Sequence, residues 1–386
     1  MREAFKRREA TPLIMRVGII GAGPAGLTAA RILAENGAEV HVFEEHPQIG
    51  VPVHCTGIVS SEFFSRAELD EDFIVNEVSS VHAHAGRISR ELPVNGTEIV
   101  LARDRFDQHL GMRAQAAGAH IHLNHRVTTI EDLTLRVRDT RTGDERDESF
   151  ERLIGAEGPR SITARTFNLQ TKRSYYFTAQ ATIKGEFEPG RYEVHLGSIA
   201  PDYFAWVVPE SRTRARAGIG SRTKTRAYFE RFMTHRFGAG YESRILAMQG
   251  APIPLYKPFA RTSKGPVILA GDAAGHNKAT TGGGIIPSII SGEIAALKAL
   301  GRTRAAAALE VRLGLELSAH TTLRSILNRY DDAHYERLIS RASHPTISAV
   351  LRDESREFPL KLLARLALVN PRFLLAPLAF FRPSRT

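Results

Sequence analysis

The chain of 386 residues is long enough for two domains and a substantial core, and its 42% hydrophobic and 24% charged residues exclude a disordered protein. The formal net charge of +10 favours acidic partners such as a phospholipid surface, a diphosphate or an acidic electron carrier. No nucleic-acid-binding motif accompanies this charge, so we expect no nucleic-acid partner. The single cysteine excludes an internal disulfide and permits a reducing compartment, which fits a cytoplasmic location.

Residues 1–13 are basic but contain no apolar stretch long enough for a signal peptide. Met15 directly precedes a strand and would itself be a normal protein start. We therefore expect residues 1–13 to be a loose tail that need not belong to the native protein.

A nucleotide-binding signature spans residues 16–45, "RVGIIGAGPAGLTAARILAENGAEVHVFEE". It predicts a buried strand, a tight glycine turn, a helix that runs to about Asn36, and a second strand that ends near Glu44 and Glu45. The turn residues are Gly21, Gly23, Ala25 and Gly26.

Each glycine of this turn has a physical role. Gly21 permits the tight turn, Gly23 lets the backbone approach a pyrophosphate, and Gly26 lets the helix pack closely on the strand. The helix N-terminus favours phosphates, and Glu44 can accept hydrogen bonds from ribose hydroxyls. The unit predicts dinucleotide binding, and both FAD and NAD fit it.

The segment "HCTGI", residues 54–58, holds the only cysteine of the chain. A lone cysteine is often a small buried hydrophobe, but this one follows soon after the nucleotide signature. Both interpretations of Cys55 stay open at this point.

Strand-like segments fill the middle of the chain and predict an antiparallel sheet. We expect this sheet to form one wall of a cavity, with Tyr175, Phe177, Phe204 and Trp206 as wall residues. Histidines occur on strands at 82–84 and 120–125, but no cysteine or carboxylate cluster completes either set. We expect exposed strand histidines and no metal site.

The segment 265–300 identifies the cofactor more closely. A buried strand ends at Gly271 and Asp272, and Gly282, Gly283 and Gly284 then open a long apolar helix. A carboxylate can hold a sugar-alcohol chain, and a helix N-terminus that begins at Gly284 and Ile285 can face a ring that gains negative charge on reduction. This arrangement favours a flavin.

The C-terminal residues 303–386 are predicted to be helical. The last part approaches the apolar content of a membrane span, but Lys361, Arg365, Arg372 and prolines interrupt it. These three cations fall on one helical face, which favours a helix in the membrane interface over one that crosses it. A helix packed on the protein itself is the alternative. We thus expect a cytoplasmic protein, with peripheral contact to the inner face of the membrane as one option.

From about Met15 to Leu300 the chain resembles the FAD enzymes that include aromatic hydroxylases, halogenases and geranylgeranyl reductases. The order Phe204-x-Trp206-x-x-Pro209 is similar to the motif that geranylgeranyl reductases place against their lipid, with Val208 where phenylalanine is usual. Cys55-Thr56-Gly57 is similar to the family's Cys-x-Gly segment beside the flavin. Halogenases have a related tryptophan motif, so the motif is only moderately specific.

This resemblance implies further site residues. Arg103 would meet the flavin or its pyrophosphate, Val127 would offer its backbone to the adenine, and Cys55 would contact the ring, support the substrate or supply a proton. Glu157 stands where the wider class has an aspartate, which puts any cofactor role for that position in doubt.

The predicted fold is α/β, with a Rossmann-like parallel-sheet FAD domain (14–75, 99–170 and 262–302), an antiparallel-sheet substrate domain (76–98 and 171–261) and a C-terminal helical region (303–386). The expected function is reduction of polyprenyl (geranylgeranyl) lipid double bonds by reduced FAD. No second GxGxxG unit is present, so the electrons would come from docked NAD(P)H or from ferredoxin. A monooxygenase, epoxidase or halogenase, and an electron-transfer flavoprotein that reduces a quinone, remain alternatives.

Overall fold

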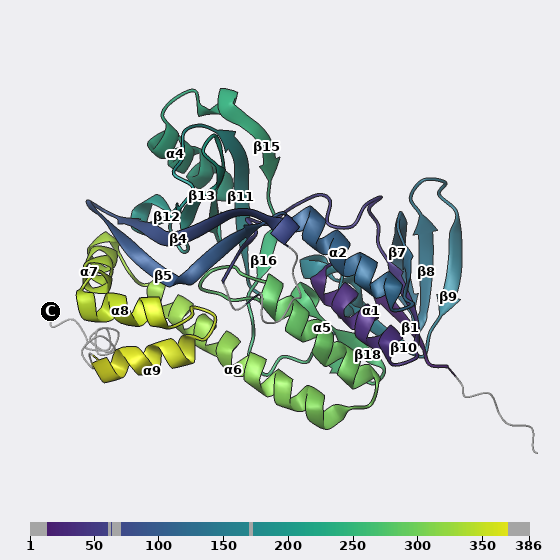
Figure 1. Ribbon diagram of the computed structural model, residues 1–386. Coiled ribbons are helices and arrows are strands. Elements are labelled where there is room, and N and C mark those ends of the chain that lie inside the picture. Colours follow the sequence, from purple (N-terminus) through teal and green to yellow (C-terminus); the bar gives the residue numbers. More distant parts are fainter. Residues whose placement is uncertain (1–13, 61–62, 64–70, 170–172, 370–386) are drawn as a thin grey trace, which may run out of the picture.

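A computed structural model describes residues 14–60, 63, 71–169 and 173–369 (Figure 1). The predicted tail of residues 1–13 and the cation Arg372 lie outside these residues.

The signature segment forms the centre of a six-stranded sheet, in the order β17–β18–β10–β1–β2–β6. All neighbours in this sheet are parallel except β17 and β18. The strands are β1 (Arg16–Ile20), β2 (Glu39–Phe43), β6 (His120–His122), β10 (Arg152–Gly155), β17 (Ser263–Lys264) and β18 (Val267–Leu269).

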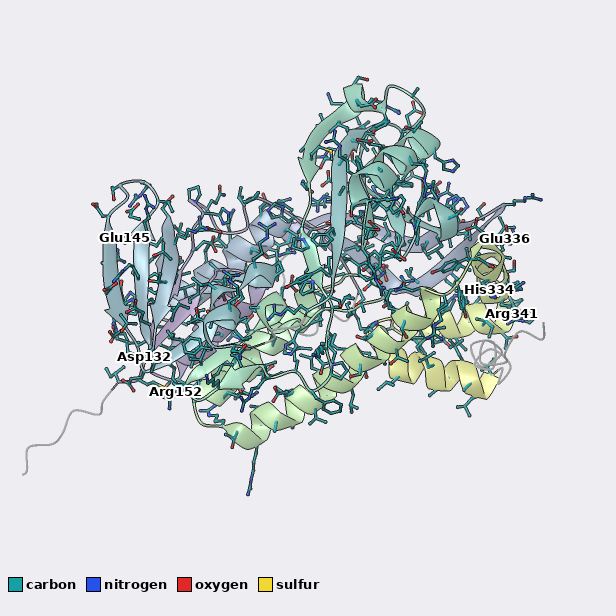
Figure 2. All side chains as sticks on the ribbon, turned by 180° about the vertical axis from the view of Figure 1, so that it is seen from behind. Asp132, Glu145, Arg152, His334, Glu336 and Arg341 are labelled. Atoms are coloured by element: carbon teal, nitrogen blue, oxygen red, sulfur yellow. The ribbon has the colours of Figure 1, made fainter. Side chains whose placement is uncertain are left out.

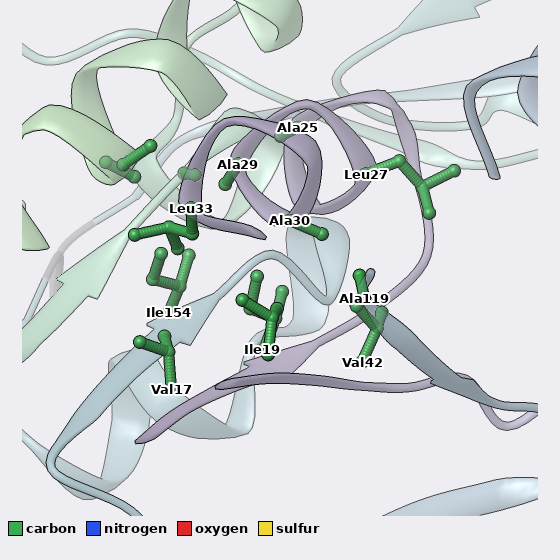
Figure 3. Close-up of a cluster of buried hydrophobic side chains, with 14 of the residues drawn as sticks. Val17, Ile19, Ala25, Leu27, Ala29, Ala30, Leu33, Val42, Ala119 and Ile154 are labelled. Atoms are coloured by element: carbon green, nitrogen blue, oxygen red, sulfur yellow. The ribbon is translucent and has the colours of Figure 1, made fainter. Parts of the chain in front are cut away.

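Helices cover one face of this sheet, and a small sheet covers the other (Figure 1). The helices are α1 (Pro24–Glu35), α2 (Arg103–Ala116) and α5 (Ile285–Ala299). Leu27 and Leu33 of α1 pack over Ile19 and Ile154 (Figure 3). The next residue along β1, Ile20, packs instead with the three-stranded sheet, because side chains alternate along a strand. That sheet consists of β7 (His125–Glu131), β8 (Thr134–Asp139) and β9 (Glu145–Ser149), and the short α3 (Ile162–Thr166) lies beside it.

The central strands form a nine-stranded sheet, in the order β15–β11–β14–β13–β12–β4–β5–β3, with β16 paired to β11. Strands β12 and β4 pair in parallel, and the other described neighbours are antiparallel. The strands are β3 (Ile58–Val59), β4 (Ile74–Ala85), β5 (Ile88–Leu101), β11 (Tyr175–Lys184), β12 (Arg191–Leu196), β13 (Ala205–Ser211), β14 (Arg214–Ser221), β15 (Ile245–Gln249) and β16 (Pro252–Pro254). Helix α4 (Thr225–Phe237) packs on this sheet through Phe229 and Phe232.

The C-terminal region is helical, as predicted, with α6 (Thr303–Leu327), α7 (Asp332–Ala342), α8 (Pro345–Asp353) and α9 (Pro359–Val369). Helix α7 holds the turn between β4 and β5, because Glu336 accepts a 2.8 Å hydrogen bond from the Arg87 backbone N–H. Figure 2 shows Glu336 and His334 at the end of the molecule opposite to Glu145 of the small sheet. Among the described residues, none of the helices combines the length and apolarity that a membrane crossing requires.

Two of the three predicted co-facial cations lie in α9, and both have an acidic neighbour at the end of α8. Lys361 pairs with Glu354 at 2.9 Å, and Arg365 lies 3.6 Å from the same carboxylate. Both pairs tie α9 to the end of α8, so two of the three predicted cations serve the protein's own packing.

Candidate flavin and substrate site

The glycine turn after β1 has the geometry that a dinucleotide needs. Gly21 has a φ of 100°, and a Cβ there would lie 2.5 Å from the Ala156 carbonyl oxygen. A Cβ at Gly26 would lie 2.1 Å from the Gly21 carbonyl oxygen, so only glycine lets α1 start here. By contrast, a Cβ at Gly23 would meet no described atom within 4 Å, which leaves room for a pyrophosphate beside the helix N-terminus.

Glu44 braces this turn from the end of β2. One of its carboxylate oxygens accepts a 2.9 Å hydrogen bond from the Ala22 N–H, and the other accepts a 3.0 Å hydrogen bond from the His46 N–H. The neighbouring Glu45 instead forms a 3.4 Å ion pair with Arg126 on the surface. The two predicted acids thus occupy different environments, and Glu44 is the one at the glycine turn.

The second half of the site lies where β18 leads into α5. A Cβ at Gly284 would lie 2.9 Å from the Asn277 amide nitrogen and 3.4 Å from the Asp272 carboxylate, so a side chain here would crowd the amide that bonds Asp272. Asn277 donates a long 3.5 Å hydrogen bond to Asp272, and burial raises the pKa of Asp272 to about 6. A ribityl hydroxyl would supply the hydrogen-bond donor that this carboxylate needs, so the residues present fit a flavin.

Arg103, at the start of α2, lies between Asp107 and the cysteine loop. It donates hydrogen bonds of 3.1 and 2.9 Å to the two oxygens of Asp107. Burial alone would lower the pKa of Arg103, but Asp107 and the Cys55 sulfur raise it above its ordinary value. Arg103 is therefore a fixed cation that faces the thiol.

The loop that carries Cys55 is bound to the antiparallel sheet. Arg216 of β14 donates hydrogen bonds of 2.8 Å to the Cys55 carbonyl and 2.9 Å to the Thr56 carbonyl. The Thr56 hydroxyl donates to Gln180 at 2.8 Å. Cys55 itself packs against a buried cluster that includes Ile285 and Ile286 at the start of α5. The thiol therefore lies at the junction of the parallel-sheet part and the antiparallel sheet.

Gln180 also orients the aromatic wall. The Trp206 indole donates a 2.9 Å hydrogen bond to the same Gln180 oxygen that Thr56 uses. Phe204 lies against Trp206 with ring centroids 5.6 Å apart. Pro209 is buried farther along β13. Of the other expected wall residues, Tyr175 is half-buried and Phe177 is 48% exposed.

A mostly apolar cavity lies between the start of α5, the middle of α6 and the segment before α9. A buried ion pair borders it, in which the Lys278 amine lies 2.6 Å from both oxygens of Glu357. The adjacent Arg356 donates a 3.4 Å hydrogen bond to Tyr192 of the antiparallel sheet. The apolar lining residues are Ile286, Pro287, Ile290, Leu309, Leu313, Leu317 and Phe358.

Two predicted positions have structural partners of their own. Val127 is buried in β7, next to a shift in strand register. The contact of its backbone with the adenine stays a prediction. Glu157 accepts a 2.7 Å hydrogen bond from the Thr163 N–H at the start of α3. This contact gives the glutamate a capping role at that helix.

Three site residues were missed in the sequence: Arg173, Gln180 and Arg216. Arg173 donates to the carbonyl oxygens of Asp272 at 3.3 Å and of Ala273, and so supports the turn before α5. Gln180 and Arg216 are buried polar residues within strands. A long polar side chain in an otherwise apolar strand, as in "RARAGIG", was the available signal.

Comparison with known proteins agrees with this geometry. Residues 15–199 match the family model described as FAD binding domain. The digeranylgeranylglycerophospholipid reductase of Methanosarcina acetivorans is 31% identical over 304 residues, which cover 73% of this chain and 74% of that protein. The enzyme of the same name from Thermoplasma acidophilum is 30% identical and covers 72% of this chain and 76% of its own.

Solved structures share the fold. A geranylgeranyl bacteriochlorophyll reductase-like protein from Thermoplasma acidophilum superposes with a TM-score of 0.80 at 23% identity, over 95% of this chain and 99% of that chain. A flavin-dependent halogenase, CmlS, gives a TM-score of 0.63 at 18% identity, over 95% of this chain and 78% of its own. At these identities the likeness is one of fold.

The fold, the glycine turn and these matches define an FAD-dependent oxidoreductase. The chain belongs to the geranylgeranyl reductase family. The predictions of FAD as cofactor and of a mixed α/β fold are confirmed.

Proposed function

We propose that this protein saturates double bonds of a polyprenyl lipid of the geranylgeranyl type. The observation that carries this proposal is the position of the Cys55 loop, which Arg216 and Gln180 hold between the flavin half-site and Trp206. The names of the relatives support the substrate class, since they act on digeranylgeranylglycerophospholipids. The apolar lining of the small cavity beside α5 is compatible in character with a prenyl chain.

The Gly21–Gly26 turn and Asp272 would hold FAD, which in its reduced form would supply the hydride that one carbon of the alkene accepts. The chain must then deliver a proton to the other carbon, and Cys55 is our candidate donor. An unactivated alkene is a poor hydride acceptor, so the aromatic wall must hold it close in a dry site. Phe204, Trp206 and Pro209 are the residues that we assign to this contact.

The electrons are proposed to come from docked NAD(P)H or from ferredoxin, for which the net charge of +10 is favourable. We also propose that the C-terminal helices bring the enzyme to an anionic membrane surface where the lipid lies. Leu368 at the end of α9 is 81% exposed, and we assign it to this contact.

The test is anaerobic reoxidation of the photoreduced flavoprotein. We expect geranylgeranyl glycerophospholipid to reoxidise the flavin faster than a short-chain quinone does, and mass spectrometry should show the product two hydrogens heavier. Quinone reoxidation without lipid reduction would favour an electron-transfer flavoprotein. Hydroxylated, epoxidised or halogenated product in the presence of oxygen would favour the halogenase-like alternatives.

A further inference from the structure

Four side chains that the flavin site does not use lie together on one face of the antiparallel sheet. Strands β4 and β12 pair in parallel, with His82 opposite Glu193 and His84 opposite His195. Side chains two residues apart share a face, so this register places three imidazoles and one carboxylate side by side. In the sequence, no cysteine or carboxylate cluster completes "HAH", and the fold brings a carboxylate to it from β12.

The ligand atoms of this group already lie close together. One nitrogen or oxygen each of His84, Glu193 and His195 fall within 4.8 Å of one another. His195 Nε2 lies 3.0 Å from a Glu193 oxygen. The rings of His84 and His195 stack with centroids 4.3 Å apart, and the His82 ring lies 4.3 Å from that of His84.

One atom of the group lacks a partner. His84 Nε2 is buried, and within the described part of the chain no hydrogen bond satisfies it. Buried polar atoms are normally paired, so this nitrogen calls for a ligand. The expectation of exposed strand histidines is wrong for His84, which is half-buried.

We propose that His84, Glu193 and His195 bind a divalent transition metal, with zinc as the best match. Two imidazoles and one carboxylate form a donor set that zinc accepts, and ligands at about 2.1 Å from the metal lie roughly 3.4 Å apart in tetrahedral geometry. The three atoms, which lie within 4.8 Å of one another, would have to move closer together to reach this spacing. His82 stands next to His84 as a further imidazole.

The surroundings suit this site. Arg236 of α4 donates hydrogen bonds of 2.7 and 2.5 Å to the two Glu193 oxygens, as outer partners of metal-bound carboxylates do. Its positive charge also weakens metal binding, so we expect a site that chelators can empty.

The metal would cross-link the one parallel junction among the described strands of this sheet. It would join the β4–β5 hairpin to β12, whose other neighbour is the Trp206 strand β13. This role is structural and does not depend on the proposed lipid reduction.

The experiment uses the full-length FAD-loaded protein without an affinity tag. The protein is treated with a chelator and dialysed against zinc, and bound metal is measured by elemental analysis. Cobalt is then bound in place of zinc, and its visible absorption reports the ligand geometry. We expect one metal per chain, and a rise in melting temperature with zinc that the chelator reverses.

The variants are His84→Ala and His195→Ala, with His122→Ala as the matched control. His122 is also a half-buried strand histidine that stacks on a neighbouring imidazole, but it belongs to β6. His84→Ala removes no hydrogen bond to Nε2, so the fold should survive, and an unchanged flavin spectrum checks this. We expect each site variant to weaken zinc binding at least tenfold, and His122→Ala to bind as the wild type does.

Zinc that stays bound with unchanged affinity in His84→Ala would overturn the proposal, as would a wild-type protein that binds no stoichiometric zinc or cobalt. Equal loss in His122→Ala would indicate scattered surface binding and would also overturn it. Lipid reduction plays no part in these measurements, so they distinguish this proposal from the proposed function.

Discussion

The Arg216 guanidinium lies 2.8 Å from the Cys55 carbonyl oxygen, although the two residues belong to different parts of the chain. The same guanidinium binds Glu210 at 2.6 Å in the sheet, so its charge is balanced while it holds the loop. Gly57, next to Thr56, has a φ of 80°, and a Cβ there would lie 2.7 Å from the Leu101 carbonyl oxygen, which explains a glycine at this position. The position of the thiol thus depends on a buried arginine of the antiparallel sheet.

We expect Arg216→Lys to slow lipid reduction while FAD stays bound. Lysine keeps the charge but cannot bond Glu210 and two carbonyl oxygens at once. The variant should therefore lose charge-assisted hydrogen bonding to the Cys55 loop that contributes roughly 1.5–3 kcal/mol. The measurements are flavin content and single-turnover reoxidation. Arg214→Lys is the matched control, because Arg214 pairs with the same Glu210 from a half-exposed position. Reoxidation rates that equal the wild-type rate in both variants would show that the Cys55 loop does not need Arg216.

Cys55→Ser tests the thiol directly. Serine is close in size and should leave the fold and the FAD content intact, but it is a much weaker acid and a poorer apolar contact. We expect single-turnover reoxidation by geranylgeranyl lipid to fall about tenfold, or about 1.4 kcal/mol in transition-state stabilisation. Rates that agree at equal flavin content would reduce Cys55 to a packing residue.

The flavin half-site was largely predictable from the sequence. Its turn, helix and second strand are contiguous, so the glycine spacing and the acid at the end of the second strand could be interpreted together. The placement of the Cys55 loop was harder to predict from the sequence, because Gln180 and Arg216 come from strands far along the chain. Only the strand pairing shows that one Gln180 oxygen serves both Thr56 and Trp206.

The histidine cluster illustrates the same limit. The sequence shows His82 and His84 on a strand, but Glu193 and His195 join them only through the parallel register of β4 and β12. Neither periodicity nor composition indicates that register. A site formed by residues close together in the sequence was therefore predictable here. A site formed by residues from two distant strands was not.

Asp272→Ala should weaken FAD binding by roughly 1–3 kcal/mol, through loss of a charge-assisted hydrogen bond to the cofactor. The measurement is the dissociation constant of FAD, from titration of the flavin-free protein. Asp147→Ala, which breaks an exposed ion pair with Arg136 in the small sheet, serves as the control. Unchanged FAD affinity in Asp272→Ala would argue against the assigned contact.

His276 should make the protein less stable at mildly acidic pH. Burial lowers the pKa of His276 to about 4, and its ring bonds Ser291 at 2.7 Å. The folded state therefore binds fewer protons than the unfolded state, so stability falls as the pH falls below the unfolded pKa. Between about pH 7.5 and about pH 5.5, His276 should lower the free energy of unfolding by about 1.4 kcal/mol.

The measurement is denaturant unfolding at both pH values for the wild type and His276→Gln. Glutamine can still bond Ser291 but does not titrate, so the variant should lose less stability on acidification. His120→Gln, at an exposed position, should behave as the wild type does. The same pH dependence in His276→Gln and the wild type would contradict this assignment.

The last prediction concerns membrane contact by α9. Lys361, Arg365 and Leu368 share one face by helical spacing, and the two cations are partly occupied by Glu354. We therefore expect membrane binding to depend more on the exposed Leu368 than on Lys361 and Arg365. Leu368→Glu should reduce the recovery of the protein with anionic vesicles in flotation, because it places a charge at the apolar contact.

Leu246→Glu is the control for this variant. Leu246 lies in β15 of the antiparallel sheet and is 46% exposed, so it receives the same charge at a site without a proposed lipid contact. Wild-type protein should float with anionic vesicles and less with neutral ones, since the net charge of +10 adds a long-range attraction that salt weakens. Equal recovery of all three proteins, or equal recovery with neutral and anionic vesicles, would exclude α9 as an anionic membrane anchor.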